Sequence, residues 1–184
     1  MPAKIEQTTR EDGSTEWRLK GQLHREDGPA VEQADGARVW FLNGKQHRLD
    51  GPAVQHPDGT MEWWVDGQLH RDDGPAVIEA DGSQEWCQRG QLHRDDGPAV
   101  VRYDGVQQWW VQGVRHRDDG PAVVEDGVMR QWWKNGHLHR EDGPAIEYDD
   151  GAGEWYLAGV PVDEATATDP AKRAAFLAAQ KGQG

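Results

Sequence analysis

A seven-residue motif brings an imidazole, a guanidinium and one or two carboxylates together, and it recurs along the chain. Residues 70–76 read His-Arg-Asp-Asp-Gly-Pro-Ala, and close copies occupy 24–30, 47–53, 93–99, 116–122 and 139–145, each 23 residues after the last. Such side chains could bind a metal ion or transfer protons. An enzyme needs one active site, however, and selection would let the spare copies diverge. We therefore expect no catalytic residue and interpret this motif, called the heptapeptide loop, as structural.

Local chemistry predicts a structural role for each residue type in the loop. Asp27 should accept backbone N–H bonds, Gly28 should adopt a positive φ, and Pro29 should stiffen the entry to the next strand. Arg25 should pair with a carboxylate and stack on a tryptophan. We expect no metal and no cofactor, and the weaker alternative is one metal ion per loop, bound through a histidine and an aspartate such as His70 and Asp73. The structural assignment covers His24, Arg25, Asp27, His70, Arg71, Asp73, His93, Arg94, Asp96, His116, Arg117 and Asp119.

Two further residue series keep the 23-residue step. They are Trp17, Trp40, Trp63, Trp86, Trp109, Trp132 and Trp155, and Gly21, Gly44, Gly67, Gly90, Gly113, Gly136 and Gly159. Three features with one period mean that one unit is copied. Aliphatic residues are scarce and the formal net charge is -13, but a tryptophan can bury about 150–250 Å². We expect a single repeat domain over 1–162 with a tryptophan ladder as its core.

Asp-Gly pairs between β-prone segments predict a hairpin in each repeat, because a type I′ turn needs positive φ at both central positions. If Asp35 and Gly36 form that turn, Val31 faces Trp40. The same count pairs Val54 with Trp63, Val77 with Trp86, Val100 with Trp109 and Ile146 with Trp155. We predict an all-β fold, an elongated and twisted antiparallel sheet of about seven tandem hairpins. A parallel β-helix is the alternative, disfavoured because each repeat carries a turn that reverses the chain.

The heptapeptide loop is longer than a hairpin requires, and an uncovered row of tryptophans would be an aggregating patch. We therefore expect the loop to fold back over the indoles. The pattern stops after Val162, and Asp169 as N-cap with Pro170 at the first helical position predicts a capping helix over 171–180. The segment 163–184 thus comprises a C-terminal helix and a tail that we expect to be disordered from Lys181.

The repeat combines a glycine turn followed three residues later by histidine with an Asp-Gly turn ahead of an aromatic strand. In one repeat these are Gly67, His70, Asp81-Gly82 and Trp86. This pattern resembles the MORN (membrane occupation and recognition nexus) repeat over residues 3–162, and most of all the variants found in bacterial and phage proteins. The loop differs, since a MORN unit has His-Gly-x-Gly where this chain has the longer, more charged sequence at 70–75. The resemblance implies an antiparallel hairpin sheet that serves as an interaction scaffold, without a catalytic domain.

A varying position on a constant repeated frame is where a specific partner can be recognised. The position after each constant tryptophan varies, and strand alternation places it on the opposite face. There it gives an aromatic stripe of Phe41, Trp64, Trp110, Trp133 and Tyr156. Packing of these rings across the strands is an equally good interpretation. The loops add an acidic edge that includes Asp72, Asp95 and Asp118, and we expect both features to contact a partner.

The acidic balance disfavours direct nucleic-acid binding and anionic membranes, and it favours a protein partner with a basic surface. The expected function is a non-enzymatic protein-binding scaffold or inhibitor, of the kind found among bacterial or phage immunity and anti-defence proteins. One alternative is an acidic nucleic-acid mimic that blocks a nuclease or another nucleic-acid-binding protein. Another is a metal-binding repeat protein.

The remaining expectations concern redox state, location and assembly. Cys87 is the only cysteine, so an internal disulfide or a cysteine-based zinc site cannot form. The sequence shows neither a signal-peptide pattern nor a long apolar run, and we expect a cytoplasmic protein. Open sheet ends could pair and give an oligomer.

Overall fold

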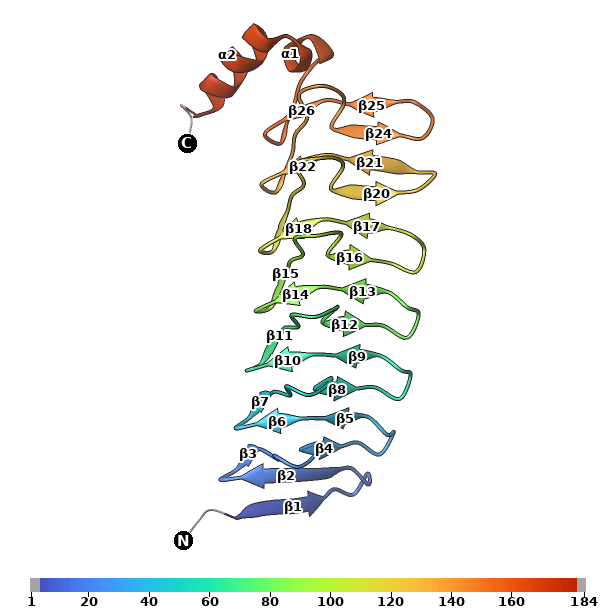
Figure 1. Ribbon diagram of the computed structural model, residues 1–184, viewed down its shortest axis with the longest axis vertical. Coiled ribbons are helices and arrows are strands. Elements are labelled where there is room, and N and C mark those ends of the chain that lie inside the picture. The colour runs from blue at the N-terminus through green and yellow to red at the C-terminus, as the bar shows by residue number, and fades with distance from the viewer. Residues whose placement is uncertain (1–3, 182–184) are drawn as a thin grey trace. The chain divides into compact units, whose positions relative to one another are not determined.

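Each repeat folds into two consecutive hairpins, and the heptapeptide loop joins it to the next repeat (Figure 1). One hairpin turns at the Asp-Gly pair and the other at the glycine that follows the constant tryptophan. The structure is a computed structural model that describes residues 4–181. The chain divides into unit 1, Met1–Leu92, and unit 2, His93–Gly184.

Unit 1 contains one main sheet whose strands follow the order β1-β2-β4-β5-β8-β9-β12-β13, with β3 paired to β2. Three small hairpins, β6–β7, β10–β11 and β14–β15, lie outside it. The strands are β1 (Ile5–Thr9), β2 (Thr15–Leu19), β3 (Gln22–Leu23), β4 (Val31–Glu32), β5 (Arg38–Val39), β6 (Phe41–Leu42), β7 (Lys45–Gln46), β8 (Val54–Gln55), β9 (Met61–Glu62), β10 (Trp64–Val65), β11 (Gln68–Leu69), β12 (Val77–Ile78), β13 (Gln84–Glu85), β14 (Cys87–Gln88) and β15 (Gln91–Leu92).

Unit 2 repeats this plan with the main order β16-β17-β20-β21-β24-β25 and the small hairpins β18–β19, β22–β23 and β26–β27. Its strands are β16 (Val100–Val101), β17 (Gln107–Gln108), β18 (Trp110–Val111), β19 (Val114–Arg115), β20 (Val123–Glu125), β21 (Met129–Gln131), β22 (Trp133–Lys134), β23 (His137–Leu138), β24 (Ile146–Tyr148), β25 (Gly153–Glu154), β26 (Tyr156–Leu157) and β27 (Val160–Pro161). Two helices follow, α1 (Glu164–Thr168) and α2 (Pro170–Lys181).

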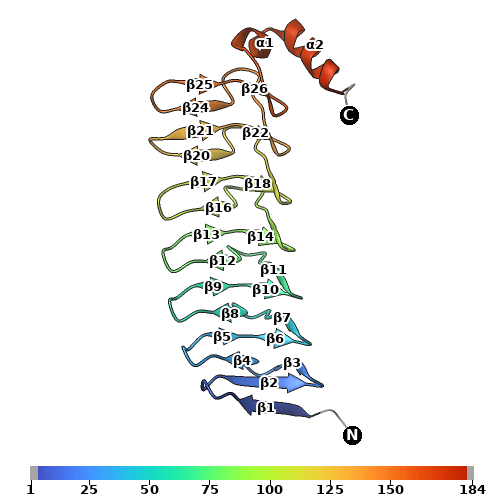
Figure 2. The same cartoon turned by 180° about the vertical axis from the view of Figure 1, so that it is seen from behind.

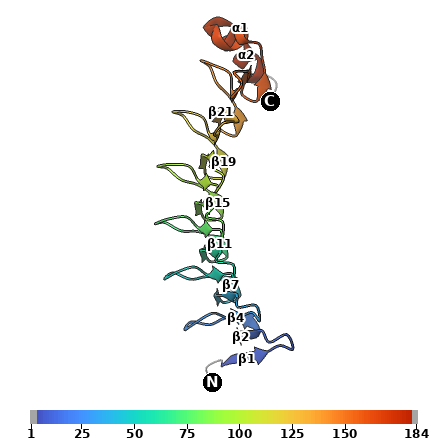
Figure 3. The ribbon, with the colours of Figure 1, turned by 90° about the vertical axis from the view of Figure 1, so that its right-hand side faces the viewer.

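The strand pairs described inside each unit are antiparallel, and they join hairpins that follow one another in chain order (Figure 2). From the side, the hairpin loops of each unit stand out from the strands (Figure 3). The predicted all-β antiparallel hairpin fold is therefore confirmed. The alternative of a parallel β-helix is wrong, because every repeat reverses the chain within its own pair of strands.

The predicted strand register is wrong by one residue. Val31 pairs with Val39 rather than with Trp40. The observed turn has three loop residues, since the Gln33 N–H donates to the Ala37 carbonyl and only Gly36, the last loop residue, has a positive φ of 97°. Three-residue hairpin loops of this kind end in a left-handed residue. The observed pairs that replace the predicted ones are Val54 with Glu62, Val77 with Glu85, Val100 with Gln108 and Ile146 with Glu154.

Two-residue turns with positive φ at both positions are present, but they lie at the other end of each repeat. Asn43 and Gly44 have φ values of 51° and 79° and connect β6 to β7, where Phe41 pairs with Gln46. This is the type I′ pattern that the sequence suggested for Asp-Gly. The same pairs of positive values occur at Asp66-Gly67, Arg89-Gly90, Gln112-Gly113, Asn135-Gly136 and Ala158-Gly159.

The position that is fully buried in repeat after repeat holds an alanine rather than a tryptophan. The last residue of each heptapeptide loop has no exposed surface, and these are Ala30, Ala53, Ala76, Ala99, Ala122 and Ala145. Val54, Val100 and Val123 are also buried, whereas the constant tryptophans are half-buried. The buried core thus contains alanines and valines where the sequence predicted a ladder of tryptophans. One face of each constant indole is left for another side chain to cover.

Both C-terminal helices begin at an aspartate cap, of which the sequence predicted only Asp169. The Asp163 carboxylate accepts the Thr166 N–H, and Asp169 accepts the N–H groups of the first turn of α2. Arg173 of α2 forms an ion pair of 3.2 Å with Glu141 in the last heptapeptide loop, which attaches the helix to the repeats. α2 includes Lys181, so the predicted tail does not begin there, and residues 182–184 lie outside the described part. No helix within 4–181 is both long and apolar enough to span a membrane.

Candidate functional site

The heptapeptide loop binds the backbone of the constant tryptophan at both ends. The His70 N–H donates to the Trp63 carbonyl at 2.9 Å, and the Trp63 N–H donates to the Ala76 carbonyl at 2.8 Å. The same two bonds connect Trp40 to His47 and Ala53, Trp109 to His116 and Ala122, and Trp132 to His139 and Ala145. Each of these loops therefore starts and ends at one tryptophan.

The arginine of the loop covers the indole. The guanidinium carbon of Arg71 lies 4.1 Å from the centre of the Trp63 ring, its Nε donates to Asp73 at 2.8 Å and its Nη1 donates to the Pro75 carbonyl at 3.3 Å. This is the stacking expected from the sequence. The hydrogen bond from Arg71 lowers the pKa of Asp73 below its usual value. Comparable stacking occurs for Arg25 on Trp17, Arg48 on Trp40, Arg117 on Trp109 and Arg140 on Trp132, at 3.8–4.2 Å.

The loop glycine makes room for this arginine. A Cβ on Gly74 would lie 3.0 Å from the guanidinium carbon of Arg71, and one on Gly28 would lie 2.9 Å from that of Arg25. Neither glycine has a positive φ. The prediction that Gly28 is required for a left-handed conformation is therefore wrong, because the close approach of a side chain is what excludes Cβ.

The histidine of each loop fixes the turn of the following repeat. The Nδ1 atom of His70 accepts the Arg89 N–H at 3.2 Å, so this nitrogen carries no proton and Nε2 carries it. The Nε2 atom lies 3.5 Å from Asp72. Equivalent bonds to Nδ1 join His24 to Asn43, His47 to Asp66, His93 to Gln112, His116 to Asn135 and His139 to Ala158. Within 4–181 no group of three or more His, Cys, Asp or Glu side chains is placed to hold a metal ion.

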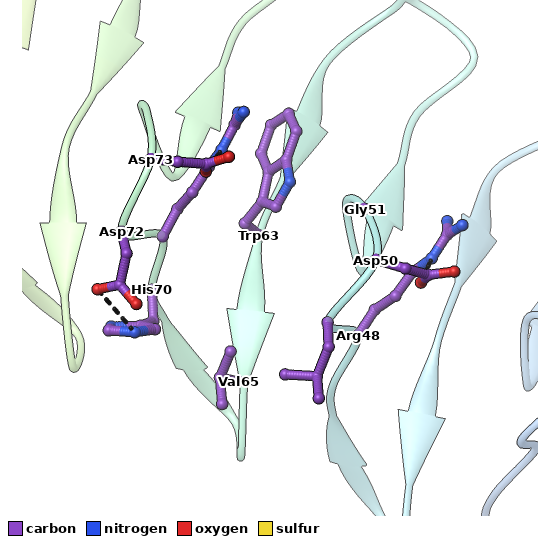
Figure 4. A pocket seen from close by; sticks show the side chains of 10 residues that line it. Arg48, Asp50, Gly51, Trp63, Val65, His70, Asp72 and Asp73 are labelled. Carbon is purple, nitrogen blue, oxygen red and sulfur yellow. Dashed lines mark hydrogen bonds and ion pairs between the residues drawn. The ribbon is translucent and has the colours of Figure 1, made fainter.

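A groove lies between each pair of consecutive loops in unit 1. Figure 4 shows one of them, with Trp63 and Val65 between residues 48–51 on one side and 70–73 on the other. Its volume is about 570 Å³. The preceding groove, of about 750 Å³, holds Trp40 and Leu42 between the loops at 25–29 and 47–50.

Unit 2 has two grooves built in the same way. The first, of about 530 Å³, contains Trp109 and Val111. The second, of about 470 Å³, contains Trp132 and Lys134. Each groove thus has a tryptophan floor and walls contributed by two heptapeptide loops.

The groove walls are acidic and open to solvent. Asp72, Asp95 and Asp118, which the sequence singled out, line them with side chains that are 83%, 87% and 74% exposed. Leu49 occupies the corresponding position in the second loop and is 80% exposed. At this loop position the walls carry an exposed acid except at Leu49, and the loop arginines also line the grooves.

The predicted aromatic stripe lies apart from these grooves. None of its members lines any of the four grooves just described, and all are half-buried. The ring N–H groups of Trp64, Trp110 and Trp133 donate to Glu62, Gln108 and Gln131 two residues earlier, and the Tyr156 hydroxyl donates to Glu154, while Phe41 lies in β6. The structure thus brings the predicted acids together with the constant tryptophans rather than with the varying ones.

The sequence reasoning missed the groove residues Leu42, Val65 and Leu49. The first two occupy one repeat position, two residues after the constant tryptophan. A signal for the third was available, because Leu49 interrupts a series of acids at a constant position.

The chain matches no protein-family model and no curated protein.

Proposed function

We propose that this protein is a non-enzymatic scaffold or inhibitor whose acidic grooves bind basic segments of a protein partner. The observation that carries the proposal is the repeated groove with a tryptophan floor and exposed carboxylates on both walls. A lysine or arginine has an apolar stem and a charged head. In the groove of Figure 4 the stem can contact Trp63 and Val65 while the head reaches Asp72.

One groove also contains a lysine of this chain, in addition to the loop arginines that line all four grooves. Lys134 lines the groove above Trp132, and its Nζ atom lies 3.8 Å from Asp118. The other three grooves have Leu42, Val65 or Val111 at the position of this lysine. An internal lysine seated beside a wall carboxylate supports the view that these grooves suit cationic side chains. It also supports assigning partner binding to the grooves without a lysine.

The hydrogen bonds of the heptapeptide loop support a role without catalysis. The His70 Nδ1 atom accepts a backbone N–H, and Asp73 accepts from an arginine that is itself stacked on Trp63. These groups are occupied by contacts that hold the loop together. A general base needs a free lone pair within reach of a substrate proton, and the bond to Nδ1 occupies that lone pair in His70.

We further propose that the repeat is a MORN-type variant. The glycine turn at Gly67, His70 and the hairpin turn at Gly82 keep their expected order and lie in one antiparallel hairpin array. The longer loop supplies the arginine and the acids that form the groove walls. An immunity or anti-defence role would use the same surface to block a basic partner.

An acidic nucleic-acid mimic is the second proposal, favoured by the exposed carboxylates alone. A mimic needs its negative charges spaced like phosphates, and duplex DNA carries one charge per ≈ 1.7 Å of axis. Consecutive loops lie farther apart, at about 9–10 Å, which is two strand spacings. A mimic also has no use for an apolar groove floor. The basic-segment proposal accounts for both the floor and the walls.

The test uses a fluorescently labelled oligolysine as the probe and anisotropy as the readout. Binding should weaken several-fold in Asp72→Asn, Asp95→Asn or Asp118→Asn and should weaken as salt is added. Glu6→Gln, an exposed acid in β1, removes the same charge away from the grooves and should leave binding unchanged. Equal binding by all these variants, or no binding by the parent, contradicts the proposal.

Val65→Thr separates the two proposals, because it makes the groove floor more polar with little change in size. Weaker oligolysine binding by this variant supports basic-segment recognition in the groove. If Val65→Thr binds like the parent while the carboxylate variants lose binding, charge alone determines affinity. The mimic is then the better description, and duplex DNA should compete for the same basic partners.

A further inference from the structure

Leu49 differs from its counterparts in the other heptapeptide loops. At the third loop position the other five have an acid, namely Glu26, Asp72, Asp95, Asp118 and Glu141. Leu49 is 80% exposed, so it contributes little to the folded core. An exposed leucine at this position therefore has an apolar surface available to a partner.

The position of Leu49 relates it to both grooves of unit 1. It lines the groove above Trp40 and also the groove above Trp63. The loop that carries Leu49 forms the wall shared by the two grooves, and Arg48 and Asp50 of this loop also line both of them. The Asp50 side chain is 84% exposed. A partner that enters both grooves must pass over Leu49.

The repeat spacing limits the conformation of such a partner. Consecutive repeats contribute two strands each to the sheet, so equivalent groove positions lie about 9–10 Å apart. Three residues make one turn of a polyproline II helix and span about 9.3 Å, so the side chains at i and i+3 point the same way. In a β-strand the side chains at i and i+3 point to opposite faces, and three residues of an α-helix span only about 4.5 Å. An extended segment in the polyproline II conformation therefore matches the groove spacing with basic residues at positions i and i+3.

We propose that unit 1 recognises an extended segment in which two basic residues three positions apart flank an apolar residue. The basic side chains enter the two grooves, and the apolar side chain contacts Leu49. This inference rests on the proposed binding of basic segments and adds a sequence spacing to it. It also distinguishes the grooves of unit 1 from those of unit 2, whose shared wall carries Asp118.

Three short peptides with blocked ends test the inference by isothermal titration calorimetry at low salt. The first has two lysines three positions apart with a leucine between them. The second has the same composition with adjacent lysines, and the third replaces the leucine by serine. The parent should bind the first peptide roughly tenfold more tightly than either of the others, since removal of a leucine contact alone changes affinity by about that factor.

Leu49→Asp is the matched variant, because it restores the acid found in the other loops at an exposed position. It should lose the preference for leucine over serine and keep the preference for lysines three apart. Asp118→Leu makes the reverse change at the shared wall of unit 2 and should raise the number of leucine-preferring sites. Unchanged far-ultraviolet circular dichroism in both variants excludes loss of folding as the cause.

The outcomes separate this inference from the proposed function. If the parent binds all three peptides equally, or if Leu49→Asp retains the leucine preference, the spacing and the role of Leu49 are refuted while basic-segment binding stands. If the parent binds none of them, nor oligolysine, both are refuted.

Discussion

Replacement of Arg71 by alanine should destabilise unit 1 by about 2 kcal/mol. The guanidinium lies 4.1 Å from the Trp63 ring centre and donates to the Pro75 carbonyl. Stacking of this kind contributes about 0.5–1 kcal/mol, and a hydrogen bond to a carbonyl contributes about 1 kcal/mol. The lost packing of the arginine stem on the indole adds to these.

Gly74→Ala tests the contact between Arg71 and Trp63 by crowding the arginine rather than removing it. Its Cβ would lie 3.0 Å from the guanidinium carbon of Arg71, so the arginine must move away from Trp63, at a cost of about 1 kcal/mol. Without the arginine this cost should disappear. Alanine should then be neutral or slightly stabilising, because it restricts the unfolded chain at a position without positive φ.

Urea denaturation, followed by both tryptophan fluorescence and circular dichroism, measures the free energies of unfolding of the two single variants and the double variant. The coupling between positions 71 and 74 should be about 1 kcal/mol. Arg38→Ala, at an exposed arginine in β5, serves as the control and should change stability by less than about 0.5 kcal/mol. The idea that arginine covers the indole fails if Arg71→Ala unfolds like the parent, or if Gly74→Ala costs the same in both backgrounds.

Three other predictions concern burial and charge. Arg115→Leu should raise the free energy of unfolding in urea by about 1 kcal/mol. The Arg115 Nε is buried with no hydrogen-bond partner within 4–181, and an unsatisfied buried donor costs about 1–3 kcal/mol. The loss of arginine stacking on two tryptophans offsets part of this gain. Acid should destabilise the loops, because folding lowers the pKa of Asp73. The stability that the ionised Asp73 carboxylate contributes is present above its pKa in the unfolded chain and is lost as pH falls through its pKa in the folded protein. Asp73→Asn should therefore reduce the loss of stability below about pH 4. Cys87 is 4% exposed and burial raises its pKa to about 11, so a disulfide reagent at pH 8 should label it only as fast as the native structure opens; labelling at the rate of a free thiol would show that this position is accessible.

Periodicity identified the repeat, the antiparallel hairpins and the stacking of arginine on tryptophan, because each depends on residue types that recur at fixed spacing. The register was not accessible in the same way. An Asp-Gly pair fits both a two-residue loop and the end of a three-residue loop, and the choice moves every facing pair by one residue. The difference placed Val31 opposite Val39 instead of Trp40.

The positive φ of Arg89 illustrates a different limit. Its counterparts Asn43 and Asp66 favour such turns, but Arg89, Gln112 and Ala158 give no local signal for a left-handed conformation. The N–H of Arg89 is bonded to Nδ1 of His70, 19 residues earlier. A long-range contact therefore helps to hold a conformation that the local sequence does not favour. Likewise, the grooves depend on two loops being adjacent, which only the folded array establishes.

Each heptapeptide loop bonds to the repeat that follows it in the sequence, and this gives folding during synthesis an order. The Arg48 N–H donates to the Trp64 carbonyl, and the His47 Nδ1 atom accepts the Asp66 N–H. Both partners belong to the repeat that follows in the sequence. During synthesis from the N-terminus, a loop can complete these bonds only after the next repeat has left the ribosome. Folding on the ribosome should thus follow translation with a lag of one repeat, and a chain stalled within a repeat should leave the preceding loop incomplete.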